Sequence, residues 1–208
     1  MNILAIGAHA DDIELGCGGT LIKHVMNGDT VHLLTLTDSA YSAPDGMPVR
    51  LAEEARTEAE KSAAIIGARL TILSYKSFAI PCADETVSAI LSYIQVHNID
   101  TVYSHWVHDI HLDHVQTGRA ALMAGRHVPR FMMYRSNYYT STQQFSGNLY
   151  SDISATFKRK FEAIRCFETE LKRVNYSWID FFTHQNSSDG QIIGVKYAEA
   201  FEVVRYLI

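Results

Sequence analysis

The chain has 208 residues, of which 47% are hydrophobic and 20% are charged, and its formal net charge at pH 7 is −5. These values fit a soluble globular protein, most simply one domain over residues 1–208 with a sizeable apolar core. A weakly acidic chain without a long basic run is a poor candidate for binding nucleic acid or an anionic membrane surface.

The N-terminal sequence and the cysteines indicate a cytoplasmic protein. The opening MNILAIGAHADD lacks the basic and apolar regions of a signal peptide. No segment approaches the roughly 18 apolar residues that a membrane-spanning helix needs. The three cysteines, Cys17, Cys82 and Cys166, are far apart and odd in number, as expected for free thiols in a reducing compartment.

Strands and helices alternate through the first part of the chain. In order, the pattern predicts a strand at Asn2–Ala8, a helix at Cys17–Asn27, a strand at Thr30–Leu36, a loop at Asp38–Pro48, a helix at Val49–Ile66, a strand at Leu70–Tyr75, a helix at Asp84–His97, a strand at Ile99–Ser104 and a helix at Val115–Gly125. This order is typical of βαβ units and predicts an α/β fold with a mostly parallel sheet.

The alternation is weaker after Gly125. The sequence there predicts a strand at Arg130–Ser136, a loop at Thr140–Asn148, helices at Ser154–Phe167 and Tyr176–His184, and a final segment at Ala200–Leu207 that fits either a helix end or a strand. We find no internal repeat and no linker.

Two segments rich in histidine and aspartate each follow a predicted strand directly. The first is His9–Asp12, and the second is His105–His114, with the sequence HWVHDIHLDH. Ligands of open α/β sheets bind at the carboxyl ends of the strands. We therefore expect both segments to lie on the same edge of the sheet.

A divalent metal explains why carboxylates and imidazoles gather there, because a cation offsets the repulsion between the carboxylates. Imidazole nitrogen and carboxylate oxygen suit zinc, and catalytic zinc commonly has three protein ligands and one open position. His9 and Asp12 flank one short turn, and either His114 or His111 completes the set. Zn²⁺ is the expected ion, with Fe²⁺ as the alternative.

The remaining polar residues suggest how such a site would work. Asp11 neighbours a ligand and is expected to act as general base toward a metal-activated water. His111 would stabilise an oxyanion or, as an imidazolium, protonate a leaving amine. Asp113 would orient a histidine. His105 and His108 stay open between bystanders and substrate contacts, and the other histidines are expected to be structural or on the surface.

The glycine-rich run Gly16–Gly19 does not have the spacing of a dinucleotide-binding loop. Asp11 and Asp12 also stand where a pyrophosphate would have to approach. We expect the glycines to let the first helix lie close to the sheet or to the metal loop.

Several segments resemble the PIG-L/LmbE-like zinc-dependent deacetylases. AHADDIELGCGGT is similar to the first motif of that family and HDIHLDHVQTG to its second, and the stretches GDTVHLLTLTD and ARTEAEKSAAIIGA also agree. The resemblance implies a Rossmann-like three-layer sandwich and removal of N-acetyl groups from N-acetylglucosamine moieties.

Carried over by position, the resemblance implies zinc ligands His9, Asp12 and His114, Asp11 as general base, His111 as the electrophilic or acid-side histidine with Asp113 as its supporting carboxylate, and Arg56 as a weaker candidate for binding the sugar. Two positions depart from the family pattern. Ala10 replaces the usual proline, and Ile13 replaces the glutamate that often follows the paired aspartates, with Glu14 next.

The substrate and its partners are less determined. A small amino-sugar substrate is expected, and a closed homo-oligomer is a common state for such proteins. The aromatic and polar stretch Tyr134–Phe145 suits a sugar-binding wall, an oligomer contact or a plain loop. The rival functions are an amidase acting on another N-acyl or thiol conjugate, and a sugar- or nucleotide-binding module without activity.

Overall fold

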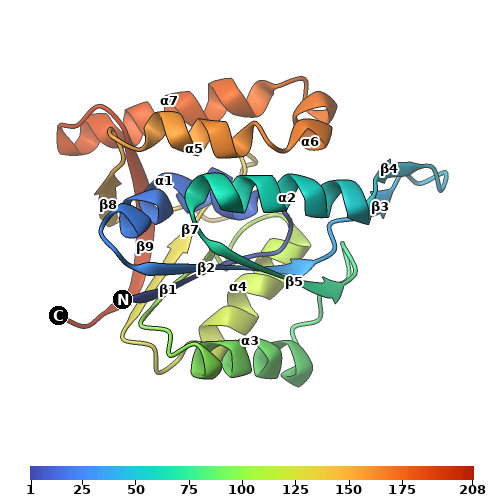
Figure 1. Cartoon of the computed structure of the whole chain (residues 1–208), viewed down its shortest axis with the longest axis horizontal. Helices are drawn as coiled ribbons and strands as arrows, with labels where there is room; N and C mark the ends of the chain where they lie inside the picture. The colour runs from blue at the N-terminus through green and yellow to red at the C-terminus, as the bar shows by residue number, and fades with distance from the viewer.

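A seven-stranded sheet forms the centre of the computed structural model, which describes all 208 residues (Figure 1). Its strands are β1 (Asn2–Gly7), β2 (Thr30–Thr37), β5 (Arg69–Tyr75), β6 (Thr101–His105), β7 (Arg130–Tyr134), β8 (Leu149–Asp152) and β9 (Ala198–Tyr206), in the spatial order β5-β2-β1-β6-β7-β9-β8. The first five strands in the order are parallel, whereas β9 runs antiparallel to both β7 and β8. This confirms the α/β fold with a mostly parallel sheet.

Helices cover both faces of the sheet. They are α1 (Asp12–Met26), α2 (Ala52–Ile66), α3 (Asp84–Val96), α4 (Leu112–Ala124), α5 (Phe157–Ile164), α6 (Glu168–Arg173) and α7 (Ser177–Ile193). Figure 1 shows α3 and α4 on one face and α1, α2, α5 and α7 on the other. None of these helices has both the length and the apolar character that crossing a bilayer requires.

Two apolar cores hold the layers together. One lies between the sheet and the pair α3 and α4, and contains Ile90, Val102 and Phe131. The other lies between the sheet and the pair α1 and α2, and contains Ile3, Leu21 and Ile66. Parallel strands are buried on both faces. This is why β1 is apolar along almost its whole length, and why every residue of β6 and every residue of β2 after Thr30 is buried.

The structure departs from the predicted elements in a few places. The first helix begins at Asp12 and not at the predicted Cys17, and it therefore contains the whole glycine run Gly16–Gly19. The segment at Ala198–Tyr206 is a strand, and the short elements β8 and α6 were not predicted. A small hairpin of β3 (Tyr41–Ser42) and β4 (Pro48–Arg50) occupies the predicted loop at Asp38–Pro48 and the next two residues.

Gly16 lets α1 lie directly on the sheet. A Cβ atom at this position would come within 2.1 Å of the Tyr134 ring, and Tyr134 is itself fixed because its hydroxyl donates to the Ile6 carbonyl at 2.7 Å. This confirms that the glycine run serves close packing of the first helix on the sheet. The packing sets the position of the N-terminal end of α1, where Asp11 and Asp12 lie.

We expect Gly16→Ala to lower the free energy of unfolding by about 1–3 kcal/mol, because the extra methyl overpacks a closed core. Gly18→Ala is the matched control, since its Cβ would have no neighbour closer than 3.6 Å. That variant should be neutral or up to about 1 kcal/mol more stable, because alanine favours the helix. Urea unfolding of both variants tests the contrast, and equal stabilities would contradict it.

Candidate active site

The two predicted segments meet at the point where the connections of the sheet change direction. From β1 the chain passes through α1 to β2 on one side, while β6 lies on the other side of β1. The loop from β1 to α1 carries His9 and Asp11, and the segment from the end of β6 into α4 carries His105 to His114. Both lie at the carboxyl ends of their strands, so the prediction of one shared edge is confirmed.

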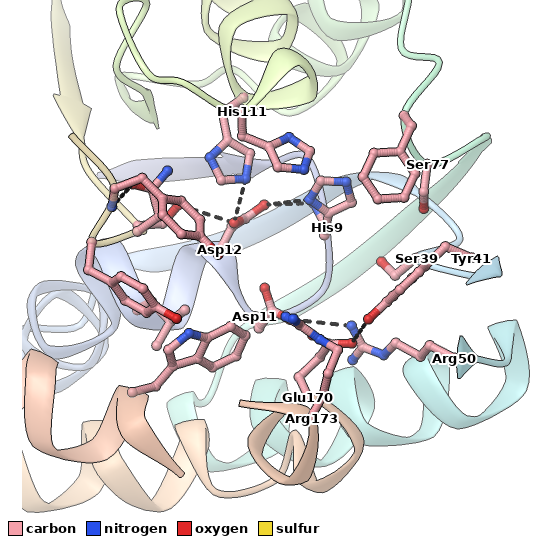
Figure 2. Close-up of a pocket in the computed structure, with 18 residues that line it drawn as sticks. His9, Asp11, Asp12, Ser39, Tyr41, Arg50, Ser77, His111, Glu170 and Arg173 are labelled. Atoms are coloured by element: carbon pink, nitrogen blue, oxygen red, sulfur yellow. Dashed lines mark hydrogen bonds and ion pairs between the residues drawn. The ribbon is translucent and has the colours of Figure 1, made fainter. Parts of the chain in front are cut away.

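Asp12 lies between two histidines (Figure 2). His9 Nδ1 is 3.4 Å from Asp12 Oδ2, and His114 Nε2 is 3.1 Å from Asp12 Oδ1. The other nitrogen of each ring faces a second carboxylate, with His9 Nε2 at 3.0 Å from Asp113 Oδ2 and His114 Nδ1 at 3.3 Å from Asp109 Oδ2. Each imidazole is thus held between an inner carboxylate, which the two rings share, and an outer one.

The carboxylates draw positive charge into this cluster. Burial lowers the pKa of His9, but Asp113 and Asp12 outweigh it and raise the pKa to about 9. The pKa of His114 is raised to about 10 because Asp12 and Asp109 outweigh its burial. Burial also raises the pKa of Asp12, yet His114 and His105 bring it well below the usual value.

This charge balance fits a divalent cation. Two imidazolium rings offset part of the charge of three carboxylates, Asp12, Asp109 and Asp113, and a metal would replace the protons of the rings. The ligand atoms of His9, His111 and His114 lie within 4.8 Å of one another, as do those of Asp12, His105 and His114. The expected set His9, Asp12 and His114 is divided between these two groups, with His114 common to both.

His105 is less suited to be a ligand than its position suggests. It is fully buried, its ring stacks on His114 at 4.1 Å, and its Nε2 accepts a hydrogen bond from the Ala8 N–H at 3.1 Å. The same Nε2 also lies 3.2 Å from Asp12 Oδ2. His105 does not line the cavity around His9 and Asp11, so its ring lies behind the cluster, away from the space that a substrate would enter. Burial and the neighbouring His114 lower the pKa of His105. His108, by contrast, is exposed and does not line the cavity.

His111 stands at the N-cap of α4. Its Nδ1 accepts a hydrogen bond from the Asp113 N–H at 3.2 Å, so Nε2 carries the proton of the neutral ring. Burial, together with His114 and His9, lowers the pKa of His111 to about 4. The ring is therefore neutral at pH 7, and suits the role of hydrogen-bond donor better than the imidazolium that we also considered.

The resemblance implies that the Asp113 carboxylate supports His111, but the structure shows other partners for this carboxylate. It accepts hydrogen bonds from His9 Nε2 at 3.0 Å, from the Phe78 N–H at 2.6 Å and from the Ile80 N–H at 3.3 Å. The reason is helical geometry: Asp113 lies in the first turn of α4, and its side chain points toward the loop after β5. Asp113 thus orients His9, which we expect to be a metal ligand.

Asp11 has an unusual backbone conformation, with φ 126° and ψ −32°. Such a conformation is strained for a residue with a Cβ atom, and strain of this kind is typical of functional sites. Its side chain lines the same cavity as His9 and Asp12. Burial and the adjacent Asp12 raise the pKa of Asp11 well above its usual value, although Arg50 at 3.3 Å opposes this.

Arg50 is a residue of the site that the sequence did not reveal. It is 2% exposed, and it donates to the Ala10 carbonyl at 3.1 Å, to Asp11 at 3.3 Å and to Glu58 at 2.9 Å. Arg56, the expected sugar-binding arginine, is exposed on α2 and lines a different, shallow depression with Asp38 and Glu53. The structure therefore brings Arg50, and not Arg56, to the cavity.

Asp109 is another residue that the sequence analysis left without a role. It lies in the same histidine-rich segment, but no helical or strand periodicity relates it to His114, because the chain turns between them. The available signal was that Asp109 is an acidic residue within the histidine-rich segment His105–His114.

One cavity, lined among others by His9, Asp11, Asp12, Arg50, His111 and His114, has a volume of about 290 Å³. Opposite the histidines, Glu170 accepts hydrogen bonds from the Tyr41 hydroxyl at 2.8 Å and from Arg173 Nε at 2.6 Å. Figure 2 shows these groups across the cavity from His9 and His111. The wall thus alternates carboxylates, guanidinium groups and hydroxyls, with Phe78 and Trp178 as aromatic surfaces.

Glu14 makes the stability of the protein depend on pH. Its carboxyl is buried and accepts from Ser62 Oγ at 2.7 Å, and burial raises its pKa from 4.5 to about 7. A carboxyl whose pKa is raised by folding stabilises the protein fully below pH 4.5, and this contribution is lost as the pH rises through about 7.

We expect Glu14→Gln to keep the hydrogen bond from Ser62 and to remove the fall in stability that accompanies ionisation of Glu14. The variant should exceed the parent in free energy of unfolding by about 1–3 kcal/mol at pH 8, and by much less at pH 5. Urea unfolding at both pH values measures the two differences. Differences of equal size would show that Glu14 does not titrate in this way.

The sequence of this chain is similar to that of known deacetylases. The family model described as PIG-L: GlcNAc-PI de-N-acetylase matches residues 4–124. The uncharacterized deacetylase YaiS of Escherichia coli is 32% identical over 143 residues, which cover 64% of this chain and 73% of YaiS. Diacetylchitobiose deacetylase of Thermococcus kodakarensis is 26% identical over 225 residues, covering 97% of this chain and 82% of that protein.

Solved structures share the fold. The N,N'-diacetylchitobiose deacetylase from Pyrococcus horikoshii, complexed with its inhibitor MPG, gives a TM-score of 0.84 at 22% identity, covering 98% of this chain and 83% of its own. GalB, the 4-carboxy-2-hydroxymuconate hydratase from Pseudomonas putida KT2440, gives 0.81 at 17% identity, covering 100% and 97%. Because a hydratase has this fold too, the fold alone does not decide the reaction.

The match to the family model supports more than a common fold. It extends over more than half of the chain and includes every residue from His9 to His114 that forms the cluster around Asp12. The chain therefore belongs to the PIG-L family and is an enzyme of the deacetylase type.

Proposed function

We propose that this protein is a zinc-dependent hydrolase that removes the N-acetyl group from an N-acetylglucosamine-type sugar or its conjugate. The observation that carries the proposal is the arrangement around Asp12. Two imidazoles face its carboxylate with their inner nitrogens, at 3.4 and 3.1 Å, and their outer nitrogens face Asp113 and Asp109. Histidines that bind a catalytic metal are commonly oriented by carboxylates in this way.

His9, Asp12 and His114 would hold the ion, with His9 offering Nδ1 and His114 offering Nε2. When bound, the ion would acidify a water molecule and polarise the amide carbonyl. Fe²⁺ is the alternative ion, since it accepts the same nitrogen and oxygen ligands. His111 is not needed for this set, and its Nε2–H remains available to the substrate.

Asp11 acts as the general base in this proposal. It takes a proton from the attacking water, and its raised pKa makes it a stronger base than an ordinary aspartate. Arg50 holds one oxygen of the carboxylate, which fixes the direction of the other. Once protonated, Asp11 returns the proton to the amine nitrogen, so that the C–N bond breaks and acetate and a free amino sugar leave.

His111 stabilises the negative charge that develops on the amide oxygen. A neutral imidazole with a protonated Nε2 donates a hydrogen bond to this oxygen without losing its proton. Its N-cap position, with Nδ1 accepting from the Asp113 N–H, fixes the ring in this tautomer. The imidazolium form is not required.

An acetylated amino sugar suits the cavity. Hydroxyl groups of a sugar match the polar groups of Tyr41, Glu170 and Arg173 that line the cavity, and Trp178 offers an apolar face. The names of the T. kodakarensis and P. horikoshii relatives support an N-acetylglucosamine unit as the group that reacts. Intact candidate ligands and an intact base speak for an enzyme over a sugar-binding module without activity.

A screen for acetate release tests the proposal. N-acetylated amino sugars are incubated with the protein after chelation, and again after addition of Zn²⁺ or Fe²⁺. Other N-acyl amides are tested in parallel as alternative substrates. We expect acetate from the amino sugars, loss of activity with the chelator, and recovery with the ion. Turnover that survives chelation, or that favours amides without a sugar, would overturn it.

A further inference from the structure

A buried ion pair lies against the middle of α1 and takes no part in the deacetylation scheme above. Lys160 of α5 is fully buried, and its Nζ lies 2.8 Å from Oε1 of Glu199, a residue of β9 that is 1% exposed. The Lys160 ammonium also donates to the Leu15 carbonyl at 2.9 Å and to Asn186 Oδ1 at 3.0 Å. All three of its N–H donors therefore have a partner, which fixes its position.

The Glu199 carboxylate binds the backbone of the same helix. It accepts from the Gly19 N–H at 2.9 Å, from the Thr20 N–H at 2.7 Å and from the Thr20 hydroxyl. In a regular α-helix each N–H bonds to the carbonyl four residues earlier, so that the N–H of Gly19 faces the carbonyl of Leu15. The ion pair thus gives both of these groups a charged partner, with the carboxylate on the N–H and the ammonium on the carbonyl.

Leu15 connects the ion pair to the active site. Its N–H donates to the Asp11 carbonyl at 3.0 Å, and its side chain lines the active-site cavity. Leu15 therefore stands between Lys160, which holds its carbonyl, and Asp11, which its own N–H holds. The φ of 126° at Asp11 is a conformation that persists only where the surrounding contacts enforce it.

We propose that Lys160 and Glu199 are positioning residues that fix the first turn of α1. Through Leu15 they hold Asp11 and the proposed metal ligand Asp12 in place relative to the histidines before and at the start of α4. This inference rests on the proposed function for the roles of Asp11 and Asp12. It goes beyond that function because neither member of the ion pair lines the cavity.

Stability alone does not account for such a pair. Removing two charges from water costs free energy that their attraction only offsets, so a buried ion pair adds little net stability. Its effect here is on position, because the ammonium has three acceptors and the carboxylate has four donors. Figure 1 shows α1 between the sheet and α5. Gly16 fixes the helix against Tyr134 on the sheet side, and the ion pair fixes it on the other side.

The double variant Lys160→Met/Glu199→Gln tests this role. It removes both charges and nearly keeps the size of both side chains. The glutamine oxygen still accepts from the N–H groups of α1, whereas the Leu15 carbonyl loses its donor. We expect kcat for acetate release by the zinc-loaded enzyme to fall by about 10–100-fold, the usual effect of removing a group that orients a metal ligand. KM should stay nearly unchanged, because the ion pair does not line the cavity.

Amide hydrogen exchange in the metal-free protein gives a second readout, which needs neither turnover nor metal. Exchange of the Leu15 amide should accelerate by at least about tenfold in the double variant, the effect of losing one hydrogen bond to a charged group. The amide of Leu33, in the central strand β2, should keep its rate. A merely structural role of the ion pair would instead accelerate both amides alike, through unfolding of the whole protein.

Lys158→Met/Glu162→Gln is the matched control, because it makes the same changes at two exposed positions of α5. It should alter neither kcat nor the exchange rates. Asn186→Ala removes one of the three acceptors of the Lys160 ammonium. This milder variant should give the same pattern with a smaller effect, and it decides the question if the double variant does not fold.

Faster exchange confined to the first turn of α1 supports the inference even if the parent protein releases no acetate from any sugar, in which case only the proposed function fails. Three results overturn it: unchanged exchange at Leu15 in a folded variant, equal acceleration at Leu15 and Leu33, or an unchanged kcat in an active enzyme.

Discussion

Asp11→Asn is expected to lower the rate of acetate release by about 10²–10⁴-fold, the range that a general base contributes. Asparagine has the size of aspartate but accepts no proton at neutral pH. Asp11 belongs to none of the groups whose ligand atoms converge, so the variant should bind zinc with the same stoichiometry as the parent. Zinc analysis beside an acetate assay measures both properties on one preparation.

The backbone of Asp11 provides a second readout. Because φ is 126° at this position, Asp11→Gly should relieve strain and the repulsion from Asp12, and raise the free energy of unfolding by about 1 kcal/mol. That variant should be as inactive as Asp11→Asn. A fully active Asp11→Asn, or a glycine variant that is both active and less stable, would remove Asp11 from the role of base.

His114→Ala should lose bound metal and activity together. His114 belongs to both convergent groups of ligand atoms and faces Asp12 at 3.1 Å, so no other residue replaces it without rearrangement. We expect the zinc content to fall from about one equivalent to near zero, and the activity to fall by at least about 10³-fold, since both the acidified water and the polarised carbonyl depend on the ion.

His108→Ala is the control for this variant. His108 comes from the same histidine-rich segment but is exposed and does not line the cavity, so its loss should leave zinc content and turnover unchanged. Retention of zinc and of activity by His114→Ala would mean that the ion, if one binds, is held elsewhere.

The sequence by itself determined the fold class and the edge of the sheet that carries the site. Alternating strands and helices predict a parallel sheet, and parallel connections place every loop that follows a strand on one edge. His9–Asp12 and His105–His114 both follow strands directly, so their meeting at the junction of β1 and β6 followed from topology. The glycine run also predicted that the first helix packs closely on the sheet, and in the structure Gly16 does lie too close to the Tyr134 ring to carry a side chain.

Only the tertiary structure decided which partner each side chain has. Sequence spacing places Asp113 two residues from His111, but the first turn of α4 directs its carboxylate to His9. Arg50 belongs to no motif that the sequence shows. It becomes part of the site because the hairpin of β3 and β4 brings its guanidinium group to Asp11. The cavity itself is lined by residues of the loop after β1, of the hairpin of β3 and β4, and of α6, which are parts of the chain with no common pattern. Periodicity reports the neighbours along one element, whereas these contacts join different elements and depend on how the elements pack.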